Sequence, residues 1–210
     1  MTGSSIYRPP TAVQWASIPA LGPWKGVLSA LVNNAARFPF VVFADDDDTV
    51  TIYDRYPKAR VHLLVLPRAN ISSISVLRRE HLGLVRAMIN SGKRAAELLS
   101  NAGMFPEGYK MGFHAVPSLD RLHMHLISCD MDSEALKNKK HWNSFTTEFF
   151  LPPEFVVSQI EEHGSVQIDR NRYEEVLKRP LACHKCRQSL KTIPALKSHI
   201  VNCRWADNEP

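Results

Sequence analysis

Apolar and polar positions repeat with a helical period in two parts of the chain. Apolar residues at 27, 28, 31 and 32 predict a short amphipathic helix over 24–34, with Trp24 at its start. A longer stripe predicts a helix that starts near three serines and stops before Asn101 and Gly103. Its inner residues are Leu77, Leu84, Met88, Ala95 and Leu99, and the candidate N-caps are Ser72, Ser73 and Ser75.

Several shorter runs are rich in apolar and β-branched residues and predict strands. They are 40–43 and 50–53, which flank four aspartates and form an expected hairpin, then 61–66, 111–116 and 122–128. The run 61–66 is almost continuously apolar, so we expect it inside the sheet. The last two runs are joined by a turn over 117–120. The pattern predicts an α+β fold, an antiparallel sheet backed by one long helix.

The local composition and the apolar patterning of the chain predict four parts. Residues 1–20, with Pro9, Pro10 and Pro19, are expected to be an extended lead-in, and 21–150 to form the main domain. Residues 151–180 have little apolar patterning and are expected to connect it to a small module at 181–210. The chain starts almost at the main domain, so we expect no N-terminal phosphopeptide-binding module.

Three polar residues alternate with apolar ones in the run 122–128 and just before it. Arg121, His123 and His125 should share one face of a strand, about 6.6–6.8 Å apart. Neutral imidazole is a nucleophile and its charged form a proton donor, so this face suits attack on phosphorus. The histidines could instead be structural, or be half of a metal site, although neighbouring strands offer no obvious third ligand. His62, His114 and Ser118 could fold back onto the same face, which favours a phosphate pocket.

The last thirty residues carry Cys183, Cys186, His199 and Cys203 with C-x2-C-x12-H-x3-C spacing. Two thiolates in a tight turn and two ligands one helical turn apart can close a tetrahedron around zinc. We therefore expect a small ββα-like C2HC zinc finger with a structural Zn²⁺. Its helix offers Thr192, Ala195 and Ser198 at base-reading positions, and these lack bidentate groups. Lysines and an arginine would then grip the DNA backbone without reading sequence: Lys185, Arg187, Lys191 and Lys197.

Composition changes this picture little. The chain has 210 residues, 44% hydrophobic and 22% charged, with a formal net charge of +5. That balance weakly favours polyanionic partners. No apolar run approaches the roughly 20 residues of a membrane span and no signal pattern opens the chain, so we expect an intracellular protein without membrane contact. In such a compartment the grouped cysteines indicate metal binding, and Cys129 is expected to be a bystander.

Several motifs together resemble the histidine-triad hydrolases, and among them the branch that removes AMP from DNA 5′ ends. They are Tyr56-Pro-Lys58-Ala-Arg-Val-His62, Gly112-Phe-His114-Ala-Val-Pro-Ser118, Leu122-His123-Met-His125, Leu136-Lys137-Asn-Lys139-Lys140-His141-Trp-Asn-Ser-Phe145 and the finger. The resemblance covers roughly residues 24–205. It implies the histidine-triad fold, a covalent adenylyl-histidine intermediate and no catalytic metal.

The resemblance also implies roles for individual residues. His123 matches the nucleophile, and His114 matches the histidine that protonates the leaving 5′-phosphate. His125, Ser118 and Lys58 match phosphate-holding residues, whereas His62 is expected to support the site. Arg121 stands where the family has its first triad histidine; it could clamp phosphate but cannot shuttle protons.

Two further features are interpreted through this resemblance. Lys137, Lys139 and Lys140 form a basic stretch that suits DNA backbone contact, and Lys140 matches a residue near the adenylated phosphate. Without context such a cluster would be solvated surface. Trp24 matches an aromatic wedge that stacks on the terminal base pair, and base stacking is worth about 1–3 kcal/mol; it could instead anchor its helix in the core.

The expected protein is thus a DNA deadenylase that acts in the nucleus on adenylated 5′ ends at nicks or double-strand ends. It would act as a monomer and release AMP. One alternative is a histidine-triad hydrolase of dinucleoside polyphosphates or adenylyl phosphoramidates. Another is a nucleic-acid-binding module whose histidines are structural.

Overall fold

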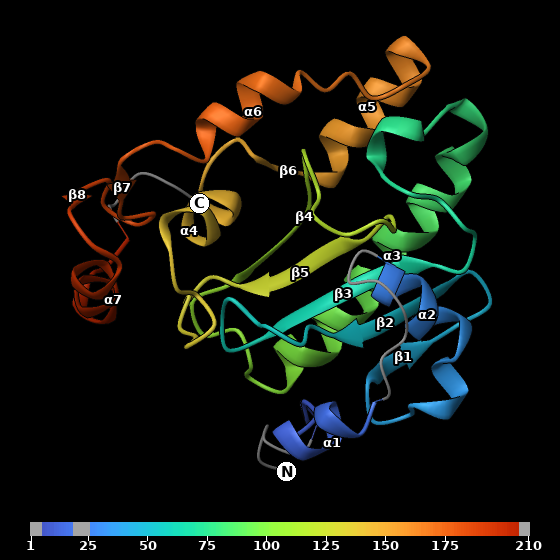
Figure 1. Ribbon diagram of the computed structural model, residues 1–210, viewed down its shortest axis with the longest axis horizontal. Helices are drawn as coiled ribbons and strands as arrows, with labels where there is room; N and C mark the ends of the chain where they lie inside the picture. The colour runs from blue at the N-terminus through green and yellow to red at the C-terminus, as the bar shows by residue number, and fades with distance from the viewer. Residues whose placement is uncertain (1–5, 19–25, 206–210) are drawn as a thin grey trace.

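A six-stranded antiparallel sheet forms the centre of the molecule in the computed structural model, which describes residues 6–18 and 26–205 (Figure 1). The strand order is β1-β2-β3-β5-β4-β6. The strands are β1 (Val42–Asp45), β2 (Thr49–Tyr53), β3 (His62–Pro67), β4 (Tyr109–His114), β5 (Met124–Ser128) and β6 (Phe150–Leu151). The predicted α+β fold with an antiparallel sheet is confirmed, and β3 lies inside the sheet as expected.

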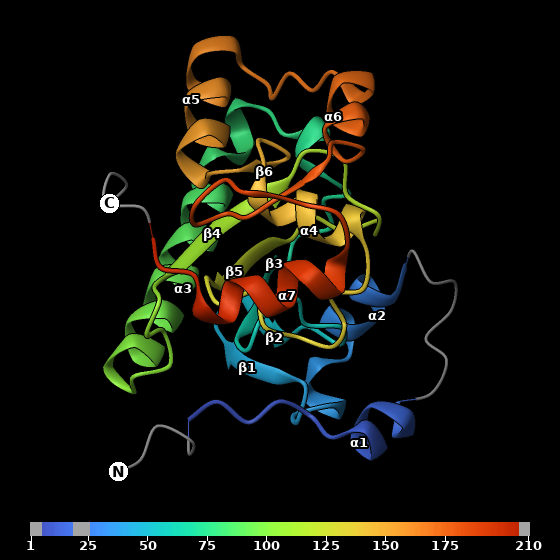
Figure 2. The same cartoon turned by 90° about the vertical axis from the view of Figure 1, so that its left-hand side faces the viewer.

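Helices cover both sides of this sheet. The long helix α3 (Leu82–Asn101) contacts β2, β3 and β5, and α2 (Val27–Asn33) lies on the opposite side (Figure 2). The other α-helices are α1 (Ala12–Ser17), α4 (Lys139–Thr146), α5 (Pro153–His163), α6 (Arg170–Val176) and α7 (Ile193–Asn202), with short 3-10 turns η3 (Ala35–Arg37), η4 (Ile74–Val76) and η5 (Arg79–His81). The core helix α3 presents a continuous buried stripe that includes Val85, Met88, Ala95 and Leu99.

The register of the central strands brings four histidines to one face. His125 on β5 lies opposite Leu64 on β3 and Gly112 on β4. Residues opposite one another in a sheet share a face, and so do residues two positions apart along a strand. His62 and His114 therefore join His125 on that face, and His123, directly before β5, completes the set.

Gly112 allows β6 to approach this face closely. A Cβ atom at Gly112 would lie 2.6 Å from a ring carbon of Phe150 and 2.7 Å from the carbonyl oxygen of Leu151. Because one of these atoms is backbone, an alanine would displace β6. Glycine at this position thus places the Phe150 ring against the histidines.

The structure differs from two predictions, one on the start of the long helix and one on the conformation of the lead-in. The long helix begins at Leu82 rather than at the serines, because η4 and η5 intervene and His81 is its N-cap. The lead-in is not extended throughout: 12–17 form α1, with a capping box between Thr11 and Gln14. The Tyr7 hydroxyl accepts a hydrogen bond from the His62 N–H at 3.1 Å, so this segment is tied to the sheet.

Residues 151–180 are not a mere connection. Leu151 pairs with Phe113 through β6, and Val156 and Ile160 of α5 are fully buried in the main core. Tyr173 and Val176 of α6 belong to the same core cluster. The predicted boundary at 150/151 therefore cuts through one packed unit.

The C-terminal module has the expected ββα form, with β7 (Leu181–Ala182), β8 (Ser189–Leu190) and α7. Leu196 and Ile200 of α7 are buried in a cluster that includes Trp142 of α4. The Trp142 indole donates to the Ala182 carbonyl at 2.9 Å. The finger therefore shares a hydrophobic core with the sheet domain.

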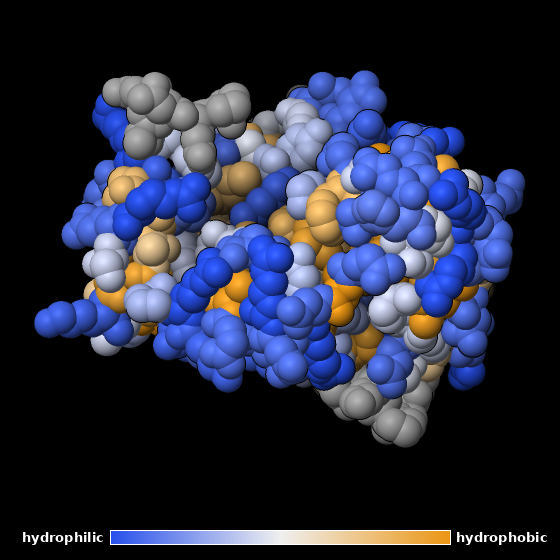
Figure 3. Space-filling model, turned by 90° about the horizontal axis from the view of Figure 1, so that it is seen from above, coloured by the Kyte–Doolittle hydropathy of each residue, from blue (hydrophilic) through white to orange (hydrophobic). Residues whose placement is uncertain are grey.

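The face of the molecule seen from above is largely hydrophilic (Figure 3). Figure 3 views the molecule from the top of Figure 1, where α5 and α6 lie, and shows apolar patches enclosed by hydrophilic residues. Among residues 6–18 and 26–205, no helix has the length and apolar character required to cross a bilayer.

Candidate active site

A cavity of about 1160 Å³ opens over the histidine face of the sheet. Its floor carries His62, His114, His123 and His125. One end is apolar and is formed by α1, α2 and the sheet: Trp15, Ile18, Val27, Leu28, Leu31, Ile52 and Leu64. The other end is basic and includes Lys137, Lys139, Lys140 and His141. The cavity thus combines an apolar recess, a cluster of imidazoles and a cationic rim.

His123 is held with one ring nitrogen free for chemistry. Its Nδ1 lies 2.7 Å from the carbonyl oxygen of Arg121, and a carbonyl can only accept, so Nδ1 carries the proton. Nε2 then has a lone pair. Burial lowers the pKa of His123, although the hydrogen bond to Arg121 opposes this effect. At neutral pH the side chain is accordingly a neutral nucleophile that lines the cavity.

His125 is oriented by a chain of hydrogen bonds that begins at the backbone. The Lys58 N–H donates to Nδ1 of His62 at 3.1 Å, so Nε2 of His62 carries the proton and donates to Nδ1 of His125 at 2.9 Å. Burial lowers the pKa of His62 to about 4, which agrees with this neutral form. The Asp54 carboxylate, 3.6 Å from Nδ1 of His62, is therefore not an ion-pair partner. His125 is left with its proton on Nε2, a buried atom without a partner among the described residues.

Aromatic rings pack around this cluster. The His114 ring lies 4.3 Å from that of His125, 4.6 Å from Phe145 and 5.3 Å from Phe149, measured between centroids. Burial holds the pKa values of His114 and His125 well below their usual range, and charge repulsion from His62 and His123 lowers both pKa values further. An anionic phosphate placed among them would favour their charged forms. The site is therefore electrostatically suited to a phosphate group.

The basic end is built around the first turn of α4. Lys139 and Lys140 occupy that turn, and Asn138 caps it by accepting from the His141 N–H at 2.9 Å. Cations are unfavourable at a helix N-terminus, whereas an anion bound there is stabilised by both the helix dipole and the lysines. Lys58, the most buried lysine of the cavity wall, donates to the Tyr56 carbonyl, and burial lowers its pKa.

The structure brings together nine of the predicted site residues around the cavity: Lys58, His62, His114, Ser118, His123, His125, Lys137, Lys139 and Lys140. Arg121, predicted to share their face and to clamp phosphate, is not among these residues. Arg121 does not line the cavity, and its guanidinium donates to the carbonyl oxygens of Pro67 and Arg68. Trp24 lies outside the described residues.

Among the lysines of the finger, Lys191 lines a groove, whereas Lys185 and Lys197 bind other parts of the protein. Lys191 lines a smaller groove with Lys139, between the finger and α4. Lys185 is buried and pairs with Glu107 at 2.6 Å, so its predicted phosphate contact is wrong. The Lys197 ammonium donates to the Ser133 carbonyl at 2.7 Å, which ties the finger to the sheet domain.

Sequence reasoning missed several residues of the cavity wall. Asp54 follows β2 directly and could have been noticed as a polar residue at a strand end. Trp15 and Arg55 form a cation–π contact at 5.7 Å, and Arg170 and Lys178 reach the cavity from the segment interpreted as a connection. No local sequence pattern predicts the last four of these residues at the cavity, because only the tertiary fold brings them together.

The four predicted metal ligands of the finger converge. The ligand atoms of Cys183, Cys186, His199 and Cys203 all lie within 4.8 Å of one another, with 3.2 Å between Cys186 and His199 and 3.8 Å between Cys183 and Cys203. These separations suit a tetrahedral ion with bonds of about 2.0–2.3 Å. A backbone hydrogen bond from Gln188 is the main cause that lowers the pKa of Cys186 to about 7. The cluster is a structural zinc site.

A second group, Asp54 with His62 and His125, also clusters, so a third ligand does exist beside the histidines. Nε2 of His62 and Nδ1 of His125 form one hydrogen bond at 2.9 Å, however. The Lys58 N–H makes His62 the donor and His125 the acceptor. This geometry serves proton placement rather than metal binding.

Two families match the chain. The family described as scavenger mRNA decapping enzyme C-term binding matches residues 26–141, and the C2HE / C2H2 / C2HC zinc-binding finger matches residues 146–204. The match to the finger family thus includes the whole of the segment 151–180, which the structure packs against the sheet.

Similar proteins carry one recurrent name. Aprataxin of Gallus gallus is 44% identical over 86% of this chain and 55% of its own length, and aprataxin of Danio rerio is 42% identical over 85% and 53%. The chain therefore spans about half the length of these curated relatives. A solved structure of the aprataxin ortholog Hnt3 in complex with DNA superposes with a TM-score of 0.71 at 23% identity, covering 85% of this chain and 94% of that one, which shows the shared fold.

Proposed function

The chain belongs to the histidine-triad family described as scavenger mRNA decapping enzyme C-term binding, on its aprataxin-like branch, and we propose that it removes AMP from adenylated DNA 5′ ends. A nucleotide hydrolase activity follows from that family. The observation that carries the finer proposal is the neutral His123, with Nε2 free, between an apolar recess and a basic rim. The recess suits a nucleobase and the rim suits a polyanionic strand.

In the proposed first step, Nε2 of His123 attacks the phosphorus of the adenylate. A P–N bond forms, and the bond to the bridging oxygen breaks as its electron pair leaves with the DNA 5′-phosphate. His114, protonated when the phosphates bind, donates its proton to that oxygen. The Nε2–H of His125, with Ser118 and Lys58, stabilises charge on the phosphoryl oxygens, which is the main source of rate in such transfers.

In the second step, water attacks phosphorus and the P–N bond breaks, which releases AMP. The electron pair returns to Nε2 of His123, and the proton of the water passes to His114. The cycle is thereby closed without any redox change. Zinc, held by the four finger ligands, stabilises the fold and takes no part in either step.

The same arrangement supports a proposal for the DNA. Lys137, Lys139 and Lys140 would hold the backbone beside the reacting phosphate, Lys191 would hold it across the smaller groove, and Trp24 would stack on the terminal base pair. The aprataxin ortholog Hnt3 was solved in complex with DNA, and that partner supports a DNA substrate here. We propose action as a monomer at nicks and double-strand ends in the nucleus.

Turnover on two substrates tests the proposal against hydrolysis of small nucleotides. We expect kcat/KM on a 5′-adenylated nicked duplex to exceed that on a free dinucleoside polyphosphate by about 100-fold or more, since binding energy from the strand is used in the transition state. Equal or better turnover of the dinucleotide would establish the small-substrate alternative. An H123A variant with undiminished activity on adenylated DNA would instead leave the histidines structural.

A further inference from the structure

Arg121 is a buried cation without a carboxylate partner among the described residues. Its side chain is 1% exposed. Nη2 donates to the carbonyl oxygens of Pro67 at 2.8 Å and Arg68 at 2.9 Å. Nη1 donates more weakly to Asn70 Oδ1 at 3.3 Å and Ser29 Oγ at 3.4 Å. Burying a charge among neutral acceptors is costly, so the arrangement calls for a function that offsets the cost.

The backbone at Arg121 contacts the nucleophile directly. Its carbonyl oxygen accepts the Nδ1–H of His123 at 2.7 Å, and this bond selects the reactive tautomer. The next N–H, of Leu122, donates to the carbonyl of Ile71 at 2.8 Å. Residues 121–123 are thus held against the segment 67–71 by the guanidinium on one side and by a main-chain bond on the other.

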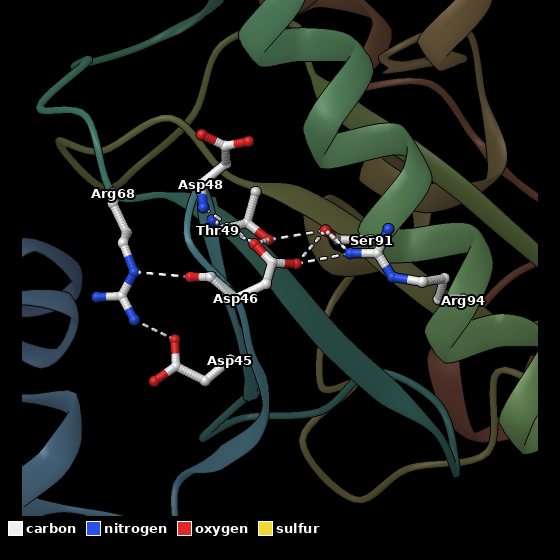
Figure 4. A network of polar contacts seen from close by, with 7 residues as sticks. All are labelled: Asp45, Asp46, Asp48, Thr49, Arg68, Ser91 and Arg94. Carbon is white, nitrogen blue, oxygen red and sulfur yellow. Dashed lines mark hydrogen bonds and ion pairs between the residues drawn. The ribbon is translucent and has the colours of Figure 1, made fainter.

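The segment 67–71 is itself anchored to the long helix. The Arg68 side chain donates to the Asp46 carbonyl at 2.9 Å and pairs with the Asp45 carboxylate (Figure 4). The Asp46 carboxylate in turn accepts from Ser91 at 2.8 Å and from Arg94 at 2.6 Å, both on α3. Figure 4 shows this network from Arg68 to Arg94. Arg121 is the link that extends it to the active site.

We propose that Arg121 is a positioning residue: its guanidinium fixes the main-chain carbonyl that holds His123 in the Nδ1-protonated tautomer. The proposal rests on the proposed function only for the nucleophilic role of His123. The two terminal nitrogens of the planar guanidinium serve different acceptors: Nη2 binds both carbonyls, and Nη1 reaches Asn70 and Ser29. The single nitrogen of a lysine ammonium cannot serve both pairs of acceptors. Lysine at this position is therefore a poor substitute despite its equal charge.

The test compares Arg121→Met, which keeps bulk without donors, with Arg121→Lys and with a remote control. Leu99→Ala removes buried bulk from α3 away from the cavity and lowers stability without changing the contacts between residues 121–123 and 67–71. Ring ¹⁵N spectra of His123 report its tautomer without any substrate. Single-turnover rates of AMP transfer are measured with adenylated nicked duplex at a temperature where thermal melts show every variant folded.

We expect the native chain and L99A to show the Nδ1-protonated tautomer and equal rates. R121M should show mixed tautomers and a rate about 10- to 100-fold lower, because a misplaced nucleophile costs that much, while the Kd for AMP changes less than about threefold. R121K should fall between R121M and the native chain, and it decides the question should R121M not fold. Native tautomer and rate in R121M, or in R121K when that variant decides, would overturn the proposal. Inactivity of the native chain on adenylated DNA would refute the proposed function but leave the tautomer result standing.

Discussion

Nε2 of His62 lies 2.9 Å from Nδ1 of His125, and this contact determines which nitrogen of His125 remains available to a bound phosphate. The Lys58 N–H fixes the proton of His62 on Nε2, so His125 must accept there and keep its own proton on the opposite nitrogen. A backbone amide thereby sets the tautomer of a side chain two hydrogen bonds away.

His62→Phe keeps an aromatic ring but removes this donor. We expect the rate of AMP transfer to fall about 10- to 100-fold, as is usual when the partner that orients an imidazole is lost. Single-turnover kinetics on adenylated duplex measure the change. His163→Phe, on the exposed end of α5, is the matched control and should leave the rate unchanged. A native rate in H62F would show that His125 needs no such orientation.

The pH dependence of activity should follow the lowered pKa of His123. The nucleophile must be neutral, and burial lowers its pKa below the ordinary value of 6.5, so the neutral form persists to lower pH. We expect the acid limb of the kcat/KM profile, where His123 gains a proton, to be centred below pH 6.5, whereas the need for a protonated His114 acts on the alkaline side of the profile. A pH–rate profile, with NMR titration of the His123 ring, measures both quantities. An acid limb centred at or above pH 6.5 would contradict the buried, neutral nucleophile.

Loss of a zinc ligand should destabilise the whole chain. Leu196 and Ile200 of the finger are buried together with Trp142, so the finger and the sheet domain should unfold as one unit. We expect Cys203→Ser to lower the free energy of unfolding by at least about 3 kcal/mol, since metal binding contributes directly to folding. Urea unfolding monitored by tryptophan fluorescence measures it.

Cys129→Ser is the control for that measurement. Cys129 is half-buried and lies outside the four-ligand cluster, so its variant should retain zinc and most of the stability. If C203S unfolded in two separate transitions, with the main one unchanged, the shared core would not couple the finger to the sheet domain.

Local periodicity was sufficient to predict the features that local geometry determines. Strands β2, β3 and β5, the long helix and the finger ligands follow from patterns within single segments. The face shared by His123 and His125 followed from alternation, which holds where the backbone is extended. Alternation did not show that the Arg121 guanidinium binds the carbonyls of Pro67 and Arg68 instead of lining the cavity, because those partners come from another segment.

Features assembled from distant segments could not be predicted in this way. The apolar residues of α5 and α6 are interspersed with charges, so their burial becomes visible only when they pack against Phe113 and Phe149. Trp15 and Arg170 reach the cavity from opposite ends of the chain. Their spacing in the sequence carries no signal, because only the tertiary fold determines their neighbours.

The covalent state of His123 tests the central claim most directly. Protein mixed with 5′-adenylated nicked duplex is denatured with base within the first turnover, and intact mass and peptide mapping locate any bound nucleotide. We predict one AMP joined through a P–N bond to His123, and none in H123A. Turnover of the substrate with no adduct on His123 at any time, or with the AMP on another residue, would contradict the account.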